Sequence, residues 1–338
     1  AVFDGQAVSP ADVELVGLST TLATNAIVEG RGSSVCLMLI GYDPALIQQY
    51  GFERDLVTQD VVYLRGGHNG EGDEVEPLDE AAAREAILAR RDHVESFAIS
   101  GYFGVRNPVH ELRVRALVEE LTASADGQPL PVTCGHELTS RLNSVRRATT
   151  AALNARLIPL LRELIATVRR TLDDLGVAAP LMVVKGDGSL VRAEWAMRRP
   201  IETILSGPAA SVAGARHLTG RQDAIVVDMG GTTTDTAMIR DGQVSVCESG
   251  SNAGGKKTHV KALRIRTVGL GGDSFIAWNK GGFEIGPQRV APMAWLGTHG
   301  SGVDQALDFL MRRLDDYSSS TIKMQILIRQ GREDGLSL

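Results

Sequence analysis

The sequence has 338 residues, of which 43% are hydrophobic, 22% charged and 4% aromatic, and its formal net charge is −6. The negative charge argues against a nucleic-acid surface, and so few aromatic side chains leave few platforms for stacking single-stranded bases. No apolar run approaches the ~20 residues of a membrane-spanning helix. No signal peptide opens the chain, and Cys36, Cys134 and Cys247 form no Cys-x-x-Cys pair. We therefore expect a cytoplasmic protein with buried thiols that binds neither nucleic acid nor membrane.

Short apolar runs alternate with helical patterns through the first half of the chain. Strands are predicted at residues 13–18, 35–40, 61–64, 96–100 and 131–134, and helices at 78–90 and 108–120. This alternation predicts a parallel sheet with helices on its faces. The first strand leads into a polar turn with Thr20, Thr21 and Asn25, which could face a ligand or cap a helix that starts at Thr24 or Asn25.

The exits of these strands carry further candidates, because ligands of parallel sheets gather at the carboxyl ends of the strands. Gly135, His136 and Glu137 follow the strand at 131–134 directly, so His136 and Glu137 are well placed to handle a proton or a metal. The Gly-rich loop 65–74 contains His68, for which a mobile surface loop is the default interpretation.

A long helix is predicted at residues 138–174, and Pro159 should kink or split it. Thr149, Thr150 and Asn154 on this helix could contact a ligand or form a polar stripe between packed helices. A strand at 181–184 then leads into Lys185-Gly-Asp-Gly-Ser189, where Lys185 and Asp187 are either ligand contacts or a surface turn.

Residues 224–239 (Ala-Ile-Val-Val-Asp-Met-Gly-Gly-Thr-Thr-Thr-Asp-Thr-Ala-Met-Ile) predict a buried strand, a phosphate-binding turn and a second strand. Gly230 and Gly231 let the backbone turn tightly and present N–H groups to an anion, and Thr232 and Thr233 add hydroxyl donors. Asp228 and Asp235 flank the turn, where carboxylates could hold the Mg²⁺ that accompanies a nucleotide phosphate. The turn is no P-loop, since no Gly-x-x-x-x-Gly-Lys-Ser/Thr occurs.

This motif resembles the phosphate signature of the acetate and sugar kinase, Hsp70 and actin superfamily. Residues 205–215 (Leu-Ser-Gly-Pro-Ala-Ala-Ser-Val-Ala-Gly-Ala) look like the helix that joins its two lobes, and residues 267–274 (Thr-Val-Gly-Leu-Gly-Gly-Asp-Ser) like its second Gly-rich turn, with Gly271 and Gly272 as a further wall of the nucleotide site. Together with residues 19–26 (Ser-Thr-Thr-Leu-Ala-Thr-Asn-Ala), these motifs are similar to the hydantoinase A/5-oxoprolinase family.

The resemblance implies an α/β, two-lobe actin-like ATPase (ribonuclease H-like) fold with mixed sheets flanked by helices. We expect a first lobe at residues 1–205 and a second at 206–338. Families of this kind open with another Asp-x-Gly-Gly-Thr motif, and since none precedes Ser19, we expect that the N-terminal strands are missing.

The function implied is ATP-dependent hydrolysis of a cyclic amide, such as a hydantoin or 5-oxoproline, in an oligomer that could include a second, hydantoinase B-like subunit. ATP and Mg²⁺ would be the cofactors. Thr20, Thr21, Asn25, Gly230–Thr233 and Gly271–Gly272 would bind the nucleotide, Asp228 and Asp235 the metal, and these two would act in catalysis with His136 and Glu137. The alternatives are the ATP-binding subunit of a ketone carboxylase, a non-catalytic actin- or Hsp70-like ATP-binding module, and a small-molecule kinase.

Overall fold

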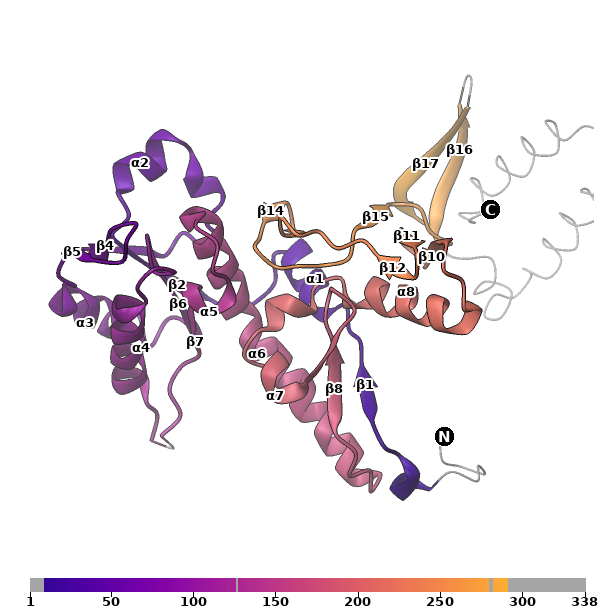
Figure 1. The fold of residues 1–338 in the computed structure, drawn as a ribbon, viewed down its shortest axis with the longest axis horizontal. Coiled ribbons are helices and arrows are strands. Elements are labelled where there is room, and N and C mark those ends of the chain that lie inside the picture. The colour runs from indigo at the N-terminus through magenta and orange to yellow at the C-terminus, as the bar shows by residue number, and fades with distance from the viewer. Residues whose placement is uncertain (1–8, 126, 280–281, 291–338) are drawn as a thin grey trace, which may run out of the picture. The chain divides into compact units, whose positions relative to one another are not determined.

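The computed structural model describes residues 9–125, 127–279 and 282–290 (Figure 1). The α-helices are α1 (Leu22–Val28), α2 (Pro44–Gln49), α3 (Glu80–Leu88), α4 (Val109–Thr122), α5 (Gly135–Leu138), α6 (Ser144–Asp174), α7 (Ala193–Ala196) and α8 (Ser206–Thr219). Three 3-10 helices span Pro10–Asp12, Phe52–Arg54 and Pro200–Thr203. The strands are β1 (Val16–Leu18), β2 (Val35–Ile40), β3 (Val61–Leu64), β4 (Gly67–His68), β5 (Glu74–Glu76), β6 (Ser96–Gly101), β7 (Val132–Cys134), β8 (Leu181–Val184), β9 (Leu190–Arg192), β10 (Ala224–Met229), β11 (Thr234–Arg240), β12 (Gln243–Val244), β13 (Asn252–Ala253), β14 (Lys256–Lys257), β15 (Ile265–Val268), β16 (Ser274–Asn279) and β17 (Gly282–Arg289).

Contacts between residues divide the chain into two compact units. The first holds the described residues up to Ala213 together with Ser245–Leu263, and the second holds Gly214–Val244 together with the described residues from Arg264 onward. The change of unit therefore lies inside α8, and the chain returns to the first unit at Ser245. The lobe boundary expected after residue 205 stays a prediction.

The first unit is built around a four-stranded parallel sheet of order β3-β2-β6-β7. Strand β2 is buried along its whole length, and its side chains alternate between two apolar clusters. Cys36, Met38 and Ile40 pack with side chains of α3 and α4, whereas Val35, Leu37 and Leu39 pack with the alanines of α6. The predicted parallel sheet with helices on both faces is thus confirmed.

Helix α6 continues through Pro159 as one element of 31 residues. Of the two outcomes expected at Pro159, the split is therefore wrong, and the kink stays a prediction. Proline removes one backbone donor from a helix interior, but both halves of α6 are held by packing. Ala148, Ala151, Ala152 and Ala155 join the cluster beneath the parallel sheet, and Leu161 and Ile165 pack beneath β8. A second sheet, of order β1-β8-β9, covers this later half. Its central strand β8 pairs with β1 in parallel and with β9 in antiparallel orientation.

The second unit contains an antiparallel sheet in which β11 pairs with β10, β12 and β15. Strand β10 was predicted to be buried, but Ile225 and Val227 are 68% and 60% exposed, so that prediction is wrong. A β-branched run does not distinguish a strand covered on two faces from one covered on one face, and antiparallel strands commonly leave a face open. The alternation of residues 243–247 after the Asp241-Gly242 turn predicts one more strand, and the observed strand β12 is shorter, ending at Val244.

Several smaller predictions can also be placed. The sequence also predicts a hairpin with strands at residues 275–278 and 282–286, and a helix at 303–314. Strands β16 and β17 form the hairpin, whereas residues 303–314 lie outside the described residues. The three cysteines are free thiols, of which Cys36 and Cys134 are buried and Cys247 is half-buried. Burial raises the pKa of Cys36 to about 12 and also raises the pKa of Cys134. Among the described residues, no helix is both long and apolar enough to cross a membrane.

Candidate functional site

The predicted phosphate turn is the tip of the β10–β11 hairpin. Asp228 and Asp235 are register partners in this hairpin, so the two carboxylates stem from facing positions. Asp235 accepts a short hydrogen bond from the hydroxyl of Thr267 on the neighbouring β15. The turn is closed by Gly230 N–H, which donates to the carbonyl of Thr233 at 2.9 Å.

The second Gly-rich turn packs directly against the first. Gly272 N–H donates to Gly230 O at 2.9 Å, and Asp273 N–H donates to Gly231 O at 2.7 Å. A Cβ atom on Gly271 would overlap the carbonyl of Gly231 and the nitrogen of Thr232, so this close approach requires glycine. In the sequence, 38 residues separate Thr233 from Gly272. In the structure, the turns Gly230–Thr233 and Gly271–Gly272 nevertheless lie in direct contact.

The interlocked turns offer donors suited to an anion. Among the described residues, no acceptor bonds the N–H groups of Gly231, Thr232 and Thr233, and Gly231 and Thr232 are exposed. Such backbone donors make a concavity for phosphate oxygens. Asp228 and Asp235 add carboxylate oxygens, the ligands that Mg²⁺ takes in small numbers beside water and phosphate. The residues present thus fit a magnesium-bound nucleotide phosphate.

Thr20, Thr21 and Asn25 belong to the first unit, at the start of α1. The backbone of Thr20 makes two hydrogen bonds with the Ser206 hydroxyl, which donates to Thr20 O at 2.9 Å and accepts from Thr20 N–H at 3.4 Å. Thr21 and Asn25 are exposed, and the Asn25 amide donates to the Thr21 hydroxyl at 3.3 Å. Helix α1 begins at Leu22, earlier than the predicted cap at Thr24 or Asn25. The backbone of Thr20, together with the hydroxyl of Thr24, which accepts from Leu205 N–H at 3.1 Å, holds the N-terminus of α8, where Leu205 has φ +60°.

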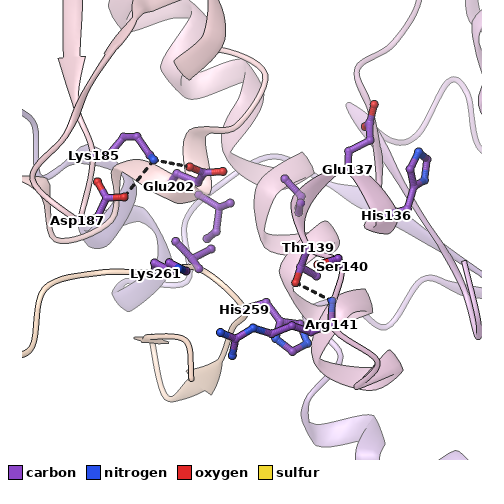
Figure 2. A pocket seen from close by; sticks show the side chains of 13 residues that line it. His136, Glu137, Thr139, Ser140, Arg141, Lys185, Asp187, Glu202, His259 and Lys261 are labelled. Atoms are coloured by element: carbon purple, nitrogen blue, oxygen red, sulfur yellow. Dashed lines mark hydrogen bonds and ion pairs between the residues drawn. The ribbon is translucent and has the colours of Figure 1, made fainter. Parts of the chain in front are cut away.

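A pocket of about 370 Å³ in the first unit collects several other candidates (Figure 2). Lys185 lies between two carboxylates, with its Nζ 3.2 Å from Asp187 and 3.1 Å from Glu202, and 5.3 Å from the centre of the Trp195 ring. Burial lowers the pKa of Lys185, but Glu202 and Asp187 outweigh burial and the net pKa is raised. Lys185 is therefore a fixed ammonium in the pocket wall.

His136 and Glu137 line one end of this pocket, on the opposite side of the view from Lys185 (Figure 2). The two terminal guanidinium nitrogens of Arg115 donate hydrogen bonds to the two carboxylate oxygens of Glu137. Burial raises the pKa of Glu137, yet the hydrogen bonds and charge of Arg115 outweigh burial and the net pKa is lowered. Glu137 is thus an ion-paired carboxylate that holds α5 to α4.

His136 is oriented by Glu111, a fully buried residue that the sequence analysis did not single out. Glu111 Oε2 accepts from His136 Nδ1 at 2.5 Å and from His136 N–H at 3.0 Å, and Oε1 accepts from Gly101 N–H at 2.7 Å. Cys134 lies close enough for the three side chains to share a metal ion. Burial raises the pKa of the Cys134 thiol, however, and so disfavours the thiolate that would bind a metal. Both oxygens of Glu111 already accept hydrogen bonds, so the three side chains form a satisfied hydrogen-bonded network.

Thr149, Thr150 and Asn154 are buried and fully engaged, as a polar stripe between packed elements would be. Thr150 accepts from His259 N–H at 3.0 Å, and the Asn154 amide donates to Thr133 Oγ1 and Arg198 O at 3.0 Å each. Glu202, Trp195 and His259 were missed by the sequence analysis because segments distant in sequence bring them to Lys185 and α6.

Two family models match the chain: the hydantoinase/oxoprolinase N-terminal region over residues 2–122, and hydantoinase/oxoprolinase over residues 147–295. The chain belongs to the hydantoinase/oxoprolinase family. In this family member, the first match holds the parallel sheet up to α4, and the second begins in α6 and takes in the Asp228 hairpin and the Gly271 turn.

Relatives of this family member with known names include three kinds of protein. Caprolactamase subunit alpha of Pseudomonas jessenii is 28% identical over 300 residues, covering 83% of this chain and 42% of the relative. 5-oxoprolinase 1 of Arabidopsis thaliana is 24% identical over 314 residues, covering 82% and 24%. The acetone carboxylase beta subunit of Xanthobacter autotrophicus is 26% identical over 241 residues, covering 70% and 32%. The chain therefore spans less than half the length of each of these relatives.

Two solved structures share the fold of this hydantoinase/oxoprolinase family member. The ATP-dependent caprolactamase from Pseudomonas jessenii matches with a TM-score of 0.69 at 28% identity, over 85% of this chain and 44% of that one. Nucleotide-free acetone carboxylase matches with a TM-score of 0.67 at 22% identity, also over 85% and 44%. At 22% identity the second likeness bears on the fold alone.

Proposed function

We propose that this chain carries the ATP-binding part of an enzyme that hydrolyses a cyclic amide, within a two-lobe actin-like ATPase fold. The observation that carries the proposal is the interlocked pair of glycine turns, framed by Asp228 and Asp235. The names of two relatives, an ATP-dependent caprolactamase and a 5-oxoprolinase, support the cyclic amide as the substrate class.

A cyclic amide resists attack by water because its carbonyl carbon is a weak electrophile. Transfer of the γ-phosphoryl group of ATP to the carbonyl oxygen, with release of ADP, makes that carbon reactive. One water then adds to that carbon and the ring C–N bond breaks, which frees the amine and leaves an acyl phosphate. A second water hydrolyses the acyl phosphate to a carboxylate and inorganic phosphate. The protein would position the reactants and stabilise charge. The N–H groups of Gly231–Thr233 would take phosphate oxygens, and Asp228 and Asp235 would hold Mg²⁺, which neutralises phosphate charge when bound.

His136 is the proposed proton carrier of this reaction, since Glu111 fixes its Nδ1 and leaves Nε2 for a substrate or water. Glu137 is less suited to carry a proton, because both of its carboxylate oxygens accept hydrogen bonds from Arg115. Thr20, Thr21 and Asn25 are also proposed to bind the nucleotide. A second subunit of the hydantoinase B kind is proposed as a partner, as the names of the caprolactamase and acetone carboxylase relatives identify them as subunits.

The second candidate function is the ATP-binding subunit of a ketone carboxylase. The acetone carboxylase beta subunit and the acetophenone carboxylase gamma subunit of Aromatoleum aromaticum, 22% identical over 308 residues, favour it. Both functions would use ATP, so the nucleotide residues would have the same roles in each.

The test is release of ADP from Mg-ATP by the purified protein, with caprolactam, hydantoin, 5-oxoproline, or acetone plus bicarbonate, and with and without a candidate second subunit. We expect a cyclic amide to stimulate turnover, and Asp228→Asn and Asp235→Asn each to abolish it without lowering the melting temperature. Asp241→Asn, in the β11–β12 turn, is the matched control and should leave turnover unchanged. Stimulation by the ketone alone would favour the carboxylase, and full turnover in both aspartate variants would refute the phosphate site.

A further inference from the structure

A second pocket of about 370 Å³ lies within the first unit, at the carboxyl ends of β2 and β3. It is lined by residues that follow β2, by the end of β3, by the β4–β5 hairpin and by Tyr102 after β6. Figure 1 shows this hairpin beside the parallel sheet. Its volume is in the range of small-molecule sites, about 300–1,000 Å³. The Asp228 hairpin contributes no lining residue, and the proposed function leaves this pocket unused.

Three tyrosines form the walls of this pocket. The rings of Tyr42 and Tyr102 meet edge to face, with centroids 5.4 Å apart, and Tyr63 lines the pocket from β3. The Tyr42 hydroxyl is 2.9 Å from both Ser100 Oγ and Ser144 O, so its ring is locked in place. Fixed aromatic faces favour a flat ring as the occupant, in stacked or edge-to-face contact.

Glycines provide the floor, since Gly41, Gly66 and Gly67 line the same pocket and all have positive φ. A Cβ atom on Gly41 would lie 2.6 Å from the carbonyl oxygen of Gly66. The two backbone segments therefore meet without side chains between them, which leaves the space above them open to a ligand.

His68 supplies the polar group of the pocket. It is 8% exposed, and its ring forms no hydrogen bond with any described residue. The ring lies against that of His110, with centroids 4.3 Å apart and planes tilted by 45°, and His110 Nε2 in turn lies 2.7 Å from Glu74 Oε1. Burial lowers the pKa of His68, and His110 lowers it further, so the imidazole is neutral at pH 7 and offers one donor and one acceptor. Its ring nitrogens are not among the buried atoms that lack a partner, so they reach the solvent of the pocket, where a ligand would replace water as their hydrogen-bond partner.

The charged groups around this pocket are already compensated or lie in solvent. Arg65 is exposed and binds Asp79 at 3.0 Å, Asp43 caps α2 through the N–H of Ala45, and Glu76 is exposed. A charged ligand would therefore lose hydration without gaining a buried counter-charge.

We propose that this pocket binds a small, uncharged, planar ring compound with an amide-like edge. The ring packs among Tyr42, Tyr63 and Tyr102, and the donor and acceptor of its edge meet His68. The site is separate from the nucleotide residues, so it does not depend on the proposed hydrolysis.

The test uses three planar probes of similar shape and different charge: benzamide, benzoate and benzamidinium. Their binding to the intact chain is measured by calorimetry without nucleotide. We expect benzamide to bind at least about tenfold more tightly than either ion, since tenfold corresponds to ~1.4 kcal/mol. Failure of benzamide to bind, or equal or tighter binding of benzoate, would overturn the proposal. None of the probes is a cyclic amide, so the result does not depend on hydrolysis.

Variants locate the binding. His68→Ala should weaken benzamide binding about three- to tenfold, the worth of one hydrogen bond, and Tyr102→Ala should weaken it to a similar degree through lost ring contact. Tyr102 is 44% exposed, so its variant tests the site even where His68→Ala perturbs folding. The matched controls His93→Ala and Tyr50→Ala, at exposed positions, should bind as the wild type does. Unchanged affinity in both pocket variants would place benzamide elsewhere and refute the site.

Discussion

Arg147 is a fully buried guanidinium that is bound by carbonyl groups. Its nitrogens donate to Arg141 O at 2.9 Å, Gly101 O at 2.6 Å and Tyr102 O at 2.7 Å. It thereby ties the start of α6 to the exit of β6, which is the edge of the sheet that carries the candidate residues. The cost of burying this charge is offset by charge-assisted hydrogen bonds.

We predict that Arg147→Met lowers the free energy of unfolding by about 2–4 kcal/mol, because three carbonyls lose their donors inside the protein. Urea unfolding at pH 7 measures this change. Arg170→Met, at an exposed position on the same helix, should change the value by less than about 0.5 kcal/mol. Equal effects of the two variants would mean that the buried hydrogen bonds contribute little.

The ion pair of Glu137 with Arg115 makes the free energy of unfolding depend on pH. Because the net pKa of Glu137 is lowered, its contribution to stability is complete above the carboxyl's unfolded pKa of about 4.3 and is lost as the pH falls through the lower folded value. Glu137→Gln should therefore be less stable than the wild type at pH 7, by at most about 1 kcal/mol since the pair is partly exposed.

The two proteins should converge in stability well below pH 4, where Glu137 is itself protonated. Unfolding curves across this pH range measure the difference. Glu163→Gln, at an exposed position of α6, is the control and should follow the wild type throughout. A difference for Glu137→Gln that stayed constant with pH would show that the carboxylate charge is not what stabilises the fold.

Sequence patterns identified those candidate residues whose role can be recognised within one short segment of the chain. Asp228 and Asp235 could be found because they flank one short turn, and the hairpin register places them opposite each other. Glu111 and Glu202 could not be found in this way. Their roles depend on ion pairs with His136 and Lys185, which belong to other segments of the chain. His68 lay in a loop that was expected to be mobile, but side-chain and backbone hydrogen bonds of Asn69 close that loop and His68 is buried.

At the scale of elements, the contact of two glycine turns can be tested most directly. We predict that Gly271→Ala lowers the free energy of unfolding by about 1–3 kcal/mol, because the new methyl group overlaps the backbone of Gly231 and Thr232. It should also weaken Mg-ATP binding, since the proposed phosphate donors lie on that backbone. Thermal unfolding and nucleotide titration measure the two effects.

Gly269→Ala is the matched control, because a Cβ atom at Gly269 meets no atom within 4 Å of its position and this glycine has no positive φ. It should leave both quantities near the wild-type values. If Gly271→Ala bound the nucleotide as tightly as Gly269→Ala, the interlocked turns would not form the phosphate site.

Element types were predictable where the pattern reflects local packing. The continuous apolar run of β2 matches a strand covered on both faces, and it is buried throughout. The path of α6 through Pro159 was not predictable, because it depends on alanines and leucines that pack against strands distant in sequence. The exposed face of β10 was missed for the same reason, since a strand's neighbours determine which of its faces is covered.

For the whole molecule, the division into two compact units predicts more than one unfolding transition. We expect differential scanning calorimetry to resolve two. Arg147→Met should shift the transition of the first unit, and Ala237→Gly, at a buried position of β11, should shift the other. A single transition that moved as a whole in both variants would show that the units unfold cooperatively.

The thiols have a practical consequence. Reaction with maleimides requires a thiolate within reach of solvent, and burial denies this to Cys36 and Cys134. Cys247 is the accessible thiol of the three, and it follows closely on Ser245, where the chain passes back from the second compact unit into the first. These 338 residues thus offer one attachment point for a fluorophore beside that crossover, and its emission could report on ligand binding without any of their cysteines being replaced.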